Sequence, residues 1–334
     1  MPLVSTETVE YGQLDPAGPV FNEEAHALPG EGRVLSDAEA RFYHEHGYVL
    51  IPNVYSDDQI EQMREGLMDL IARWAWNDEG WTGPWRKVYM DEETEKLSKL
   101  IYLHDLDLYS GAWMQAATND RLCDALVDLL GPNVEHHHQA MHVKPPQTGM
   151  PFPVHQDWPF YPHTDDRHLL ALVHLDDTND ENGCFRFLDG SHKLGALRHI
   201  VTEPDGTPCS PHLPTDAYKL EDTTPVHAKA GDVIVFNTNT IHGSNINTTN
   251  AYRRVVRIGY RTPDNEQTAG IYYQNNWGGV GIARERPNFM VRGQRPRVAG
   301  EEPFPTPGVE DDVFGVTQGG GQNARGIESQ LDRD

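Results

Sequence analysis

The sequence predicts a mainly β domain that carries helices on its N-terminal side, and two patterns support this prediction. After about residue 131 the apolar residues fall in short runs, and clusters of Pro, Gly, Asn and Asp separate those runs. Many short strands between turn signals are typical of a β-sandwich or a closed barrel. Before residue 131, the apolar residues instead recur at the spacing of helices that bury one face.

The helical part opens with two matching start signals. Ser36 is followed three residues later by Glu39, and Ser56 is followed by Gln59. This is the capping-box pattern, in which the two side chains satisfy backbone N–H groups at a helix start. Gly47 predicts the end of the first helix because a glycine readily adopts the left-handed conformation found there.

Residues 48–51 have the composition of a strand, and the second helix follows them. Its helically spaced apolar positions are Ile60, Met63, Leu67, Leu70, Ile71 and Trp74. A further helix is predicted to run from the N-cap residue Asn119 to Leu130, because Gly131 and Pro132 would stop it.

The β part contains five clear strand-like runs. They are residues 134–144, 169–175, 184–188, 233–236 and 255–260. Between the third and fourth runs, residues 204–224 are polar and rich in Pro. A loop of this length is often a lid over a site, and a solvated insertion is the alternative reading.

These patterns predict one domain with two less regular ends. Residues 1–35 are expected to be an extended arm, and residues 299–334 a peripheral tail. The domain itself covers 36–298. It divides into a helical flank at 36–131, a β core at about 132–262 and a C-terminal extension at 263–298.

Net charge, apolar runs and cysteine count limit the classes of partner and the location that the sequence predicts. The formal net charge is −24, which disfavours nucleic acid and anionic membranes as partners. The sequence contains no run of about 18 apolar residues, so no membrane span is predicted. The polar, acidic start predicts a cytoplasmic protein. The three cysteines are far apart and support neither a disulfide framework nor a cysteine zinc site. A small-molecule substrate is therefore expected, and the sequence carries no signal for an oligomeric state.

The sharpest local motif is His155-Gln156-Asp157. In a strand, residues i and i+2 project to the same face, so an imidazole and a carboxylate at this spacing can reach one ion. A pair of this kind is common by chance. His242, which follows the strand-like run 233–236, offers the second histidine of a two-histidine, one-carboxylate face. That face leaves coordination positions open and suits Fe(II) oxygen chemistry.

A possible carboxylate anchor follows His242. Arg253 lies eleven residues later, at the start of the last strand-like run. A guanidinium on the inner wall of a barrel can hold a carboxylate by two parallel hydrogen bonds. Ser244 could add a hydroxyl donor to the same carboxylate.

Across about residues 36–262 the chain resembles the phytanoyl-CoA dioxygenase family. The motifs that carry the resemblance are, in order, Lys144-Pro145-Pro146, His155-Gln156-Asp157, Asn182-Gly183-Cys184, Asp189-Gly190-Ser191-His192, His242-Gly243-Ser244 and Arg253. The resemblance implies a double-stranded β-helix, the cupin-like jelly roll, with flanking N-terminal α-helices. It also implies the cofactor Fe(II) and the cosubstrates 2-oxoglutarate and O₂.

The resemblance further assigns roles to individual positions. It implies His155, Asp157 and His242 as the iron ligands and catalytic centre. It implies Arg253 as the partner of the distal carboxylate of 2-oxoglutarate, with Ser244 nearby. Lys99 and Leu172 fall near further family positions that touch this cosubstrate, although relatives often carry Trp at the position of Leu172.

The predicted activity is that of an Fe(II)- and 2-oxoglutarate-dependent dioxygenase that hydroxylates a small organic molecule. Candidate substrates are a secondary metabolite, an organic acid or an amino-acid-like compound. Related halogenases replace the carboxylate ligand with a small residue, whereas Asp157 is present here, which favours hydroxylation, desaturation or ring closure. Two alternatives are a non-oxidative isomerase or hydrolase on a cupin-like barrel and a silent binding module. The presence of Ser244 and Arg253 favours the oxygenase, because the alternatives need no cosubstrate anchor.

Other polar and aromatic residues have weaker predicted roles. Strand alternation would send His136 and His138 to one face and His137 to the other, and a structural role is expected for all three. His142, His163, His168 and His174 are expected to be structural or pocket-lining residues. Trp158, Phe160 and Tyr161 could line the substrate mouth or pack in the core, and Gln274 and Trp277 are weaker candidates for substrate contacts.

Overall fold

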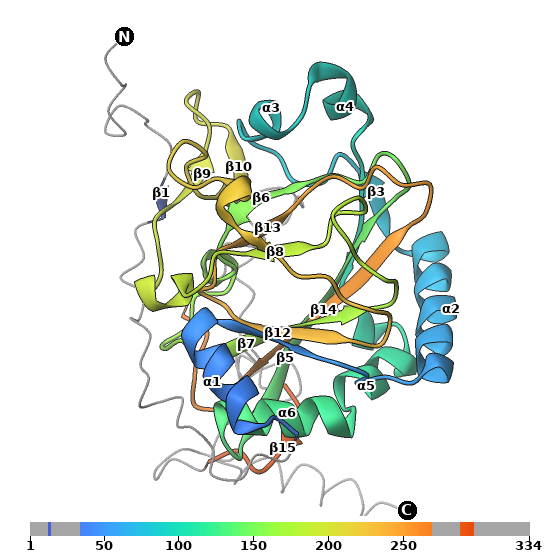
Figure 1. Ribbon diagram of the computed structural model, residues 1–334, viewed down its shortest axis with the longest axis vertical. Coiled ribbons are helices and arrows are strands. Elements are labelled where there is room, and N and C mark those ends of the chain that lie inside the picture. Colours follow the sequence, from blue (N-terminus) through green and yellow to red (C-terminus); the bar gives the residue numbers. More distant parts are fainter. Residues whose placement is uncertain (1–12, 15–33, 269–287, 297–334) are drawn as a thin grey trace, which may run out of the picture. The chain divides into compact units, whose positions relative to one another are not determined.

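The computed structural model describes residues 13–14, 34–268 and 288–296 (Figure 1). The chain divides into two units, Met1–Arg295 and Pro296–Asp334. Everything described below belongs to the first unit. Its framework is a pair of antiparallel sheets, and residues of both sheets meet in one apolar cluster that includes Leu170, Leu172, Phe185 and Phe187.

The larger sheet has eight strands. Their order is β2 (Tyr48–Ile51), β12 (Val233–Asn237), β7 (His168–His174), β14 (Arg253–Arg261), β5 (Val134–Lys144), β4 (Leu100–His104) and β3 (Trp76–Asp78), and β15 (Met290–Arg292) also pairs with β5. Neighbours such as β12 and β7 lie far apart in sequence, so this sheet forms only when the chain closes on itself.

The smaller sheet has four strands and carries the predicted metal motif. Its order is β11 (Thr224–Pro225), β8 (Phe185–Phe187), β13 (His242–Ser244) and β6 (Phe152–His155). A third sheet has the order β1 (Gln13–Leu14), β9 (His199–Thr202) and β10 (Pro208–His212). The mostly β, antiparallel architecture confirms the predicted double-stranded β-helix with helices at its N-terminal side (Figure 1).

The helices precede the β core. They are α1 (Asp37–His46), α2 (Asp57–Arg73), α3 (Arg86–Tyr89), α4 (Glu92–Leu97), α5 (Gly111–Ala117) and α6 (Asp120–Leu130). Both predicted capping boxes are present, and Asn119 caps α6. Gly47 ends α1 in the left-handed region, at a φ of 87°. The described residues also form the short 3-10 helices η2 (Leu106–Leu108), η3 (Trp158–Phe160), η4 (Ser191–Leu194) and η5 (Leu220–Asp222).

The larger sheet separates two environments. Met141, Val143, Val256 and Ile258 point to the side covered by α2, α5 and α6 and join the main apolar core there. We call this side the helix-covered face. The alternate residues of the same strands point toward the smaller sheet, and we call that side the inner face. The functional candidates discussed below lie on the inner face, on the smaller sheet or in the segments next to them.

The structure confirms the five predicted strands and corrects two other expectations. Trp74 was predicted on the buried face of α2, but it lies at the C-cap and its side chain is 58% exposed. Residues 204–224 were predicted to be one loop, but they contain β10 and η5 and bury Cys209, His212 and Leu213. Pairing of β10 with β9 accounts for this order. None of the helices in the described part is long and apolar enough to cross a membrane.

Candidate active site

His155, Asp157 and His242 come together between β6 and β13. His155 and His242 are partners in the register of the two strands, and their ring centroids are 4.2 Å apart. The distance from His155 Nε2 to Asp157 Oδ1 is 3.6 Å, and that from His242 Nε2 to Asp157 Oδ2 is 3.7 Å. All three side chains are buried. The tertiary structure therefore gathers the predicted triad.

The local geometry differs from the expected strand alternation. β6 ends at His155, and Asp157 has helical backbone angles (φ −79°, ψ −19°) directly before η3. The Gln156 side chain fixes this turn, because its amide donates to the carbonyls of Gly195 and Asn239. A pinned turn, rather than one face of a strand, brings the carboxylate to the two imidazoles.

Hydrogen bonds orient both imidazoles. His155 Nδ1 donates to the Pro153 carbonyl at 2.7 Å, and His242 Nδ1 donates to the Thr240 carbonyl at 2.9 Å. With the proton on Nδ1, each Nε2 keeps its lone pair and faces Asp157. Burial lowers the pKa of His242 to about 3, and the neighbouring His155 adds to this effect. His242 is therefore neutral near pH 7.

Asp157 is ionised although it is completely buried. Burial by itself raises the pKa of this carboxyl, but Arg257, His155 and His242 together outweigh it and hold the pKa well below its usual range. Arg257 Nη1 donates to Asp157 Oδ1 at 2.6 Å. The other oxygen, Oδ2, is buried without a hydrogen-bond partner.

These donors fit a divalent metal ion. Two neutral imidazole nitrogens and one carboxylate oxygen without a donor surround a common point, and a buried ionised oxygen of this kind requires a cation or a donor. Two histidines and one carboxylate on one face suit Fe(II), because they leave other coordination positions open. The three side chains therefore match the ligand set of an Fe(II) site.

A second polar group lies at the end of the inner face, where β14 begins. Arg253 pairs in register with Lys144 of β5, and both side chains are fully buried. Arg253 Nε and Nη2 have no hydrogen-bond partner, while Lys144 Nζ donates to Ser244 Oγ at 2.8 Å and to the Asn245 carbonyl. Burial lowers the pKa of Arg253 to about 10, so the guanidinium keeps its charge near pH 7. A buried, unpaired guanidinium is a site for an anion.

A small cavity lies beside the two histidines of the triad. The described residues that line it are Trp81, His142, Phe152, His155, Leu172, Phe185, Phe236, His242 and Arg257. Leu172 is among these lining residues, and Arg253 contacts the lining residue Phe185 at 5.2 Å from guanidinium to ring centre. Lys99 is half-buried, its backbone bridges to Gly149, and it is not among these lining residues.

The three predicted aromatic residues have different surroundings. Phe160 packs on Trp81, whose ring centre lies 4.7 Å from that of His155. Tyr161 accepts a hydrogen bond from Arg257 and stacks on His138. Trp158 is buried in η3. Gln274 and Trp277 lie outside the described residues.

Sequence reasoning missed three residues of this site, namely Trp81, Lys144 and Arg257, as functional residues. Arg257 follows Arg253 by four residues on β14, and an even spacing on a strand puts both on one face. That signal was present in the sequence. Trp81 carried no such signal, because it lies in an irregular segment and reaches the cavity only through the tertiary fold.

The prediction for the histidine run was also wrong. The pairing of β14 with β5 shifts between Gly259 and Tyr260, so Gly259 pairs with His138 and Tyr260 with His136. His137 is the extra residue of this β-bulge, which breaks the alternation. His136 stacks on Phe289, whereas His137 and His138 both contact Tyr161.

The family assignment follows from the match of this chain to known proteins. The model of the phytanoyl-CoA dioxygenase family matches residues 43–255, which include the triad and Arg253. The chain belongs to this family. Its members use iron and 2-oxoglutarate, and this chain is an Fe(II)- and 2-oxoglutarate-dependent dioxygenase that acts on a small molecule. Family membership sets aside the non-oxidative enzyme and the silent binding module.

Curated members of the family that resemble this chain act on different substrates, by their names. A probable alpha-ketoglutarate-dependent hypophosphite dioxygenase of Stutzerimonas stutzeri is 30% identical over 68% of this chain and 78% of its own length. The peroxisomal phytanoyl-CoA dioxygenase of Rattus norvegicus is 26% identical over 77% of this chain and 78% of its own. The ectoine dioxygenase of Sphingopyxis alaskensis is 24% identical over 85% and 89%.

Solved structures share the fold of this family member. EctD from S. alaskensis with 2-oxoglutarate and 5-hydroxyectoine superposes with a TM-score of 0.63 at 21% identity, over 86% of this chain and 99% of that one. SnoK, a carbocyclase from nogalamycin biosynthesis, gives a TM-score of 0.60 at 21% identity, over 79% and 98%.

Proposed function

We propose that His155, Asp157 and His242 hold the iron of this dioxygenase. Both Nε2 lone pairs and the partnerless Asp157 Oδ2 support this assignment, since they face one another in a buried site. Arg257 is proposed as a positioning residue. Its 2.6 Å hydrogen bond to Oδ1 fixes the carboxylate and leaves Oδ2 for the metal.

Arg253, Ser244 and Lys144 are proposed to bind the distal carboxylate of 2-oxoglutarate. The observation that carries this proposal is the buried guanidinium of Arg253, which has two nitrogens without a partner. A carboxylate would satisfy both by parallel hydrogen bonds. Lys144 donates to Ser244 Oγ, so the hydroxyl proton of Ser244 stays available for the same carboxylate.

The bound iron, 2-oxoglutarate and O₂ together supply the oxidising power for attack on a C–H bond. The chain positions the reactants and keeps water out of the site. Trp81, Phe152 and Phe185 line the cavity with aromatic rings and exclude water from the site. Arg257 holds the Asp157 carboxylate, and Arg253 would hold the distal carboxylate of 2-oxoglutarate, which together limit where the substrate can lie.

We propose hydroxylation of a small organic molecule as the reaction. Two relatives, the hypophosphite and ectoine dioxygenases, act by their names on small molecules, which supports a small substrate for this chain. The third metal ligand is a carboxylate, which favours hydroxylation over halogenation. A cytoplasmic location and the absence of nucleic-acid and membrane partners stay predictions, supported by the acidic composition and by three buried free thiols.

Anaerobic visible absorption tests this function. Fe(II)-loaded protein is titrated with 2-oxoglutarate in the absence of O₂, and we expect a weak charge-transfer band that saturates with the keto acid. Arg253→Gln should raise the midpoint of the titration by about tenfold to hundredfold, because it removes a charge-assisted hydrogen-bond pair.

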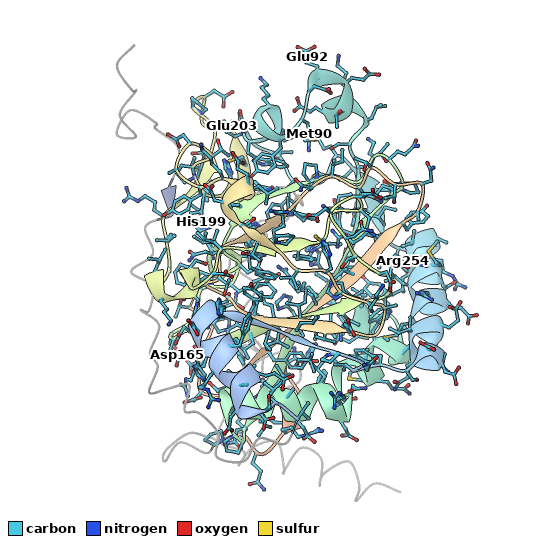
Figure 2. All side chains as sticks on the ribbon, viewed as in Figure 1. Met90, Glu92, Asp165, His199, Glu203 and Arg254 are labelled. Carbon is cyan, nitrogen blue, oxygen red and sulfur yellow. The ribbon has the colours of Figure 1, made fainter. Side chains whose placement is uncertain are left out.

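Arg254→Gln is the matched control. Arg254 is the next residue along β14, but its side chain bonds to Asp176 and lies beside α2 (Figure 2). Its removal should leave the midpoint unchanged. Equal midpoints for the two variants would mean that another group anchors the cosubstrate, and iron-loaded protein without any band would contradict the proposed iron site.

A further inference from the structure

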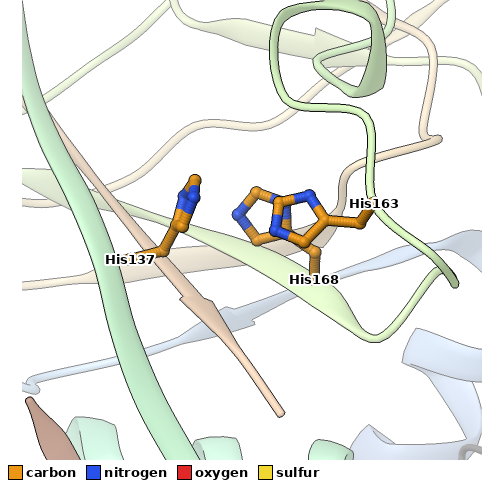
Figure 3. A group of neighbouring side chains, drawn as sticks. All are labelled: His137, His163 and His168. Carbon is orange, nitrogen blue, oxygen red and sulfur yellow. The ribbon is translucent and has the colours of Figure 1, made fainter. Parts of the chain in front are cut away.

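A second group of three histidines lies beyond Arg257 on the inner face. His137 comes from the bulge of β5, His163 from the segment after η3, and His168 from the start of β7. Their ring centroids are 4.3 to 5.0 Å apart, and one ring nitrogen of each lies within 4.8 Å of the others. Figure 3 shows His137 facing the other two rings.

The hydrogen bonds of the group leave lone pairs at its centre. His163 Nδ1 donates to the Tyr161 carbonyl at 2.6 Å, so Nε2 keeps its lone pair. His168 is fully buried, and neither of its ring nitrogens has a hydrogen-bond partner. Burying a polar group without a partner costs free energy that a bound ligand would recover.

His137 has an orienting partner and a further donor beside it. His137 Nδ1 and His138 Nδ1 are 2.7 Å apart and share one proton. Gln267 Oε1 lies 2.9 Å from His137 Nε2 and can only accept, so Nε2 donates this hydrogen bond and the shared proton is on His138 Nδ1. A metal at Nε2 would displace that proton: His137 would then be protonated on Nδ1 and His138 on Nε2, and Gln267 Oε1 would be a fourth ligand atom.

The imidazoles of the group are in the neutral form. The pKa values of His137 and His168 are well below the usual value, because burial and neighbouring positive groups disfavour the charged form. Neutral imidazoles are the form that binds metal. Arg261 is nearby, but Glu135 faces it at 3.4 Å, and its contact with His163 Nε2 is at the 3.4 Å limit of a hydrogen bond. Arg261 Nη1 also donates to the Asn265 carbonyl, so a metal can replace the His163 contact.

We propose that His137, His163 and His168 form a second metal site that binds Zn²⁺, with Gln267 Oε1 as the fourth ligand. Three imidazoles and one oxygen suit zinc, which accepts four tetrahedral nitrogen and oxygen ligands. The site would join β5 and β7 to the segment that follows Asp157. That segment includes Tyr161, which bonds to Arg257, so the zinc would stabilise the wall of the active site without taking part in the reaction.

Metal analysis of the full-length protein tests the proposal. The active site is first filled with Fe(II) and 2-oxoglutarate without O₂, so that zinc cannot enter it. Zinc is then added, unbound metal is removed by dialysis, and both metals are measured by mass spectrometry. We expect about one zinc per chain in addition to iron.

Variants locate the zinc. His168→Gln should lose it and keep the iron, whereas His242→Gln should lose the iron and keep the zinc. His136→Gln is the matched control, because His136 is buried on the same bulged strand but stacks on Phe289 outside the group. It should keep both metals.

A readout on the wild-type protein covers the case in which His168→Gln does not fold. Co²⁺ in a four-coordinate site absorbs strongly in the visible, so the iron-filled protein should gain such bands with Co²⁺ and lose them with excess Zn²⁺. Iron-filled wild type that binds neither ion overturns the proposal. So does His168→Gln protein that retains as much zinc as the wild type.

Discussion

The two faces of the larger sheet are made by the same strands but have opposite chemistry. On the helix-covered face, Met141, Val143, Val256 and Ile258 form part of a continuous apolar core. On the inner face, the alternate positions of β5, β7 and β14 carry the buried side chains Lys144, His142, His138, Arg253, Arg257, His168 and His174.

This difference separates stability from chemistry within single strands. Apolar burial on the helix-covered face contributes free energy of folding. The inner face holds charged and polar groups that are only partly satisfied within the chain, such as Arg253, Asp157 and His168. Such groups cost stability unless a ligand pairs with them. Apolar burial on the helix-covered face therefore offsets the free energy that the unsatisfied groups of the inner face cost.

The largest expected effect comes from a substitution on the smaller sheet, which the inner face points toward. His242→Ala removes one of three proposed metal ligands and should lower iron affinity by more than about 100-fold, since even outer-shell changes cost up to that amount. Succinate release should fall to background. Thermal unfolding of the metal-free protein should change little, because a partly unsatisfied polar group has been removed. Full iron occupancy in this variant would contradict the ligand assignment.

Acid should destabilise the metal-free protein through the inner-face histidines. Burial lowers the pKa of His138, His142 and His168 well below 6.5, and that of His174 to about 4. As the pH falls below 6.5, the unfolded chain takes up protons that the folded chain does not, so stability decreases. Each histidine should contribute about 1 kcal/mol between pH 6.5 and 5.5, or about 4 kcal/mol for the four.

Urea unfolding at pH 7.5, 6.5 and 5.5 measures this effect. Stability should fall by about 1 kcal/mol in total between pH 7.5 and 6.5, and by about 4 kcal/mol more by pH 5.5. A free energy of unfolding that stays constant down to pH 5.5 would mean that these histidines take up protons as readily in the folded state as in the unfolded chain.

A large-to-small substitution on the helix-covered face should lower stability and leave ligand binding unchanged. Ile258→Ala deletes a fully buried side chain from the main core and should lower the free energy of unfolding by about 3 kcal/mol. Iron and 2-oxoglutarate should bind to the folded variant as before. Urea unfolding measures the loss of stability, and the anaerobic titration measures 2-oxoglutarate binding. A changed titration midpoint would show that the two faces are coupled.

The smallest expected effect tests whether a buried cation opposes stability. Lys144→Met removes the donor to Ser244 and should weaken 2-oxoglutarate binding about tenfold. Stability should be unchanged or higher, because an apolar side chain replaces a buried cationic one of similar length. Lys229→Met is the control, since Lys229 pairs with Asp177 at the surface. A marked loss of stability in Lys144→Met alone would place Lys144 among the stabilising residues.

Local signals in the sequence were sufficient where neighbours in sequence make the structure. The capping boxes at Ser36 and Ser56 and the end signal at Gly47 were predicted correctly because each involves residues within one turn. The strands at 134–144 and 233–236 were recognised from their apolar runs. Alternation failed at His137 because the bulge depends on the partner strand, β14.

The sequence by itself determined the fold class, and it predicted His155, Asp157, His242 and Arg253 as site residues, which all lie within the family match at residues 43–255. Only the tertiary structure decided how these residues meet. It placed Asp157 on a turn pinned by Gln156, set Arg257 against the carboxylate, and gathered His137, His163 and His168. The physical reason is that strands distant in sequence become neighbours, so contacts on the inner face depend on register and bulges that no local pattern encodes.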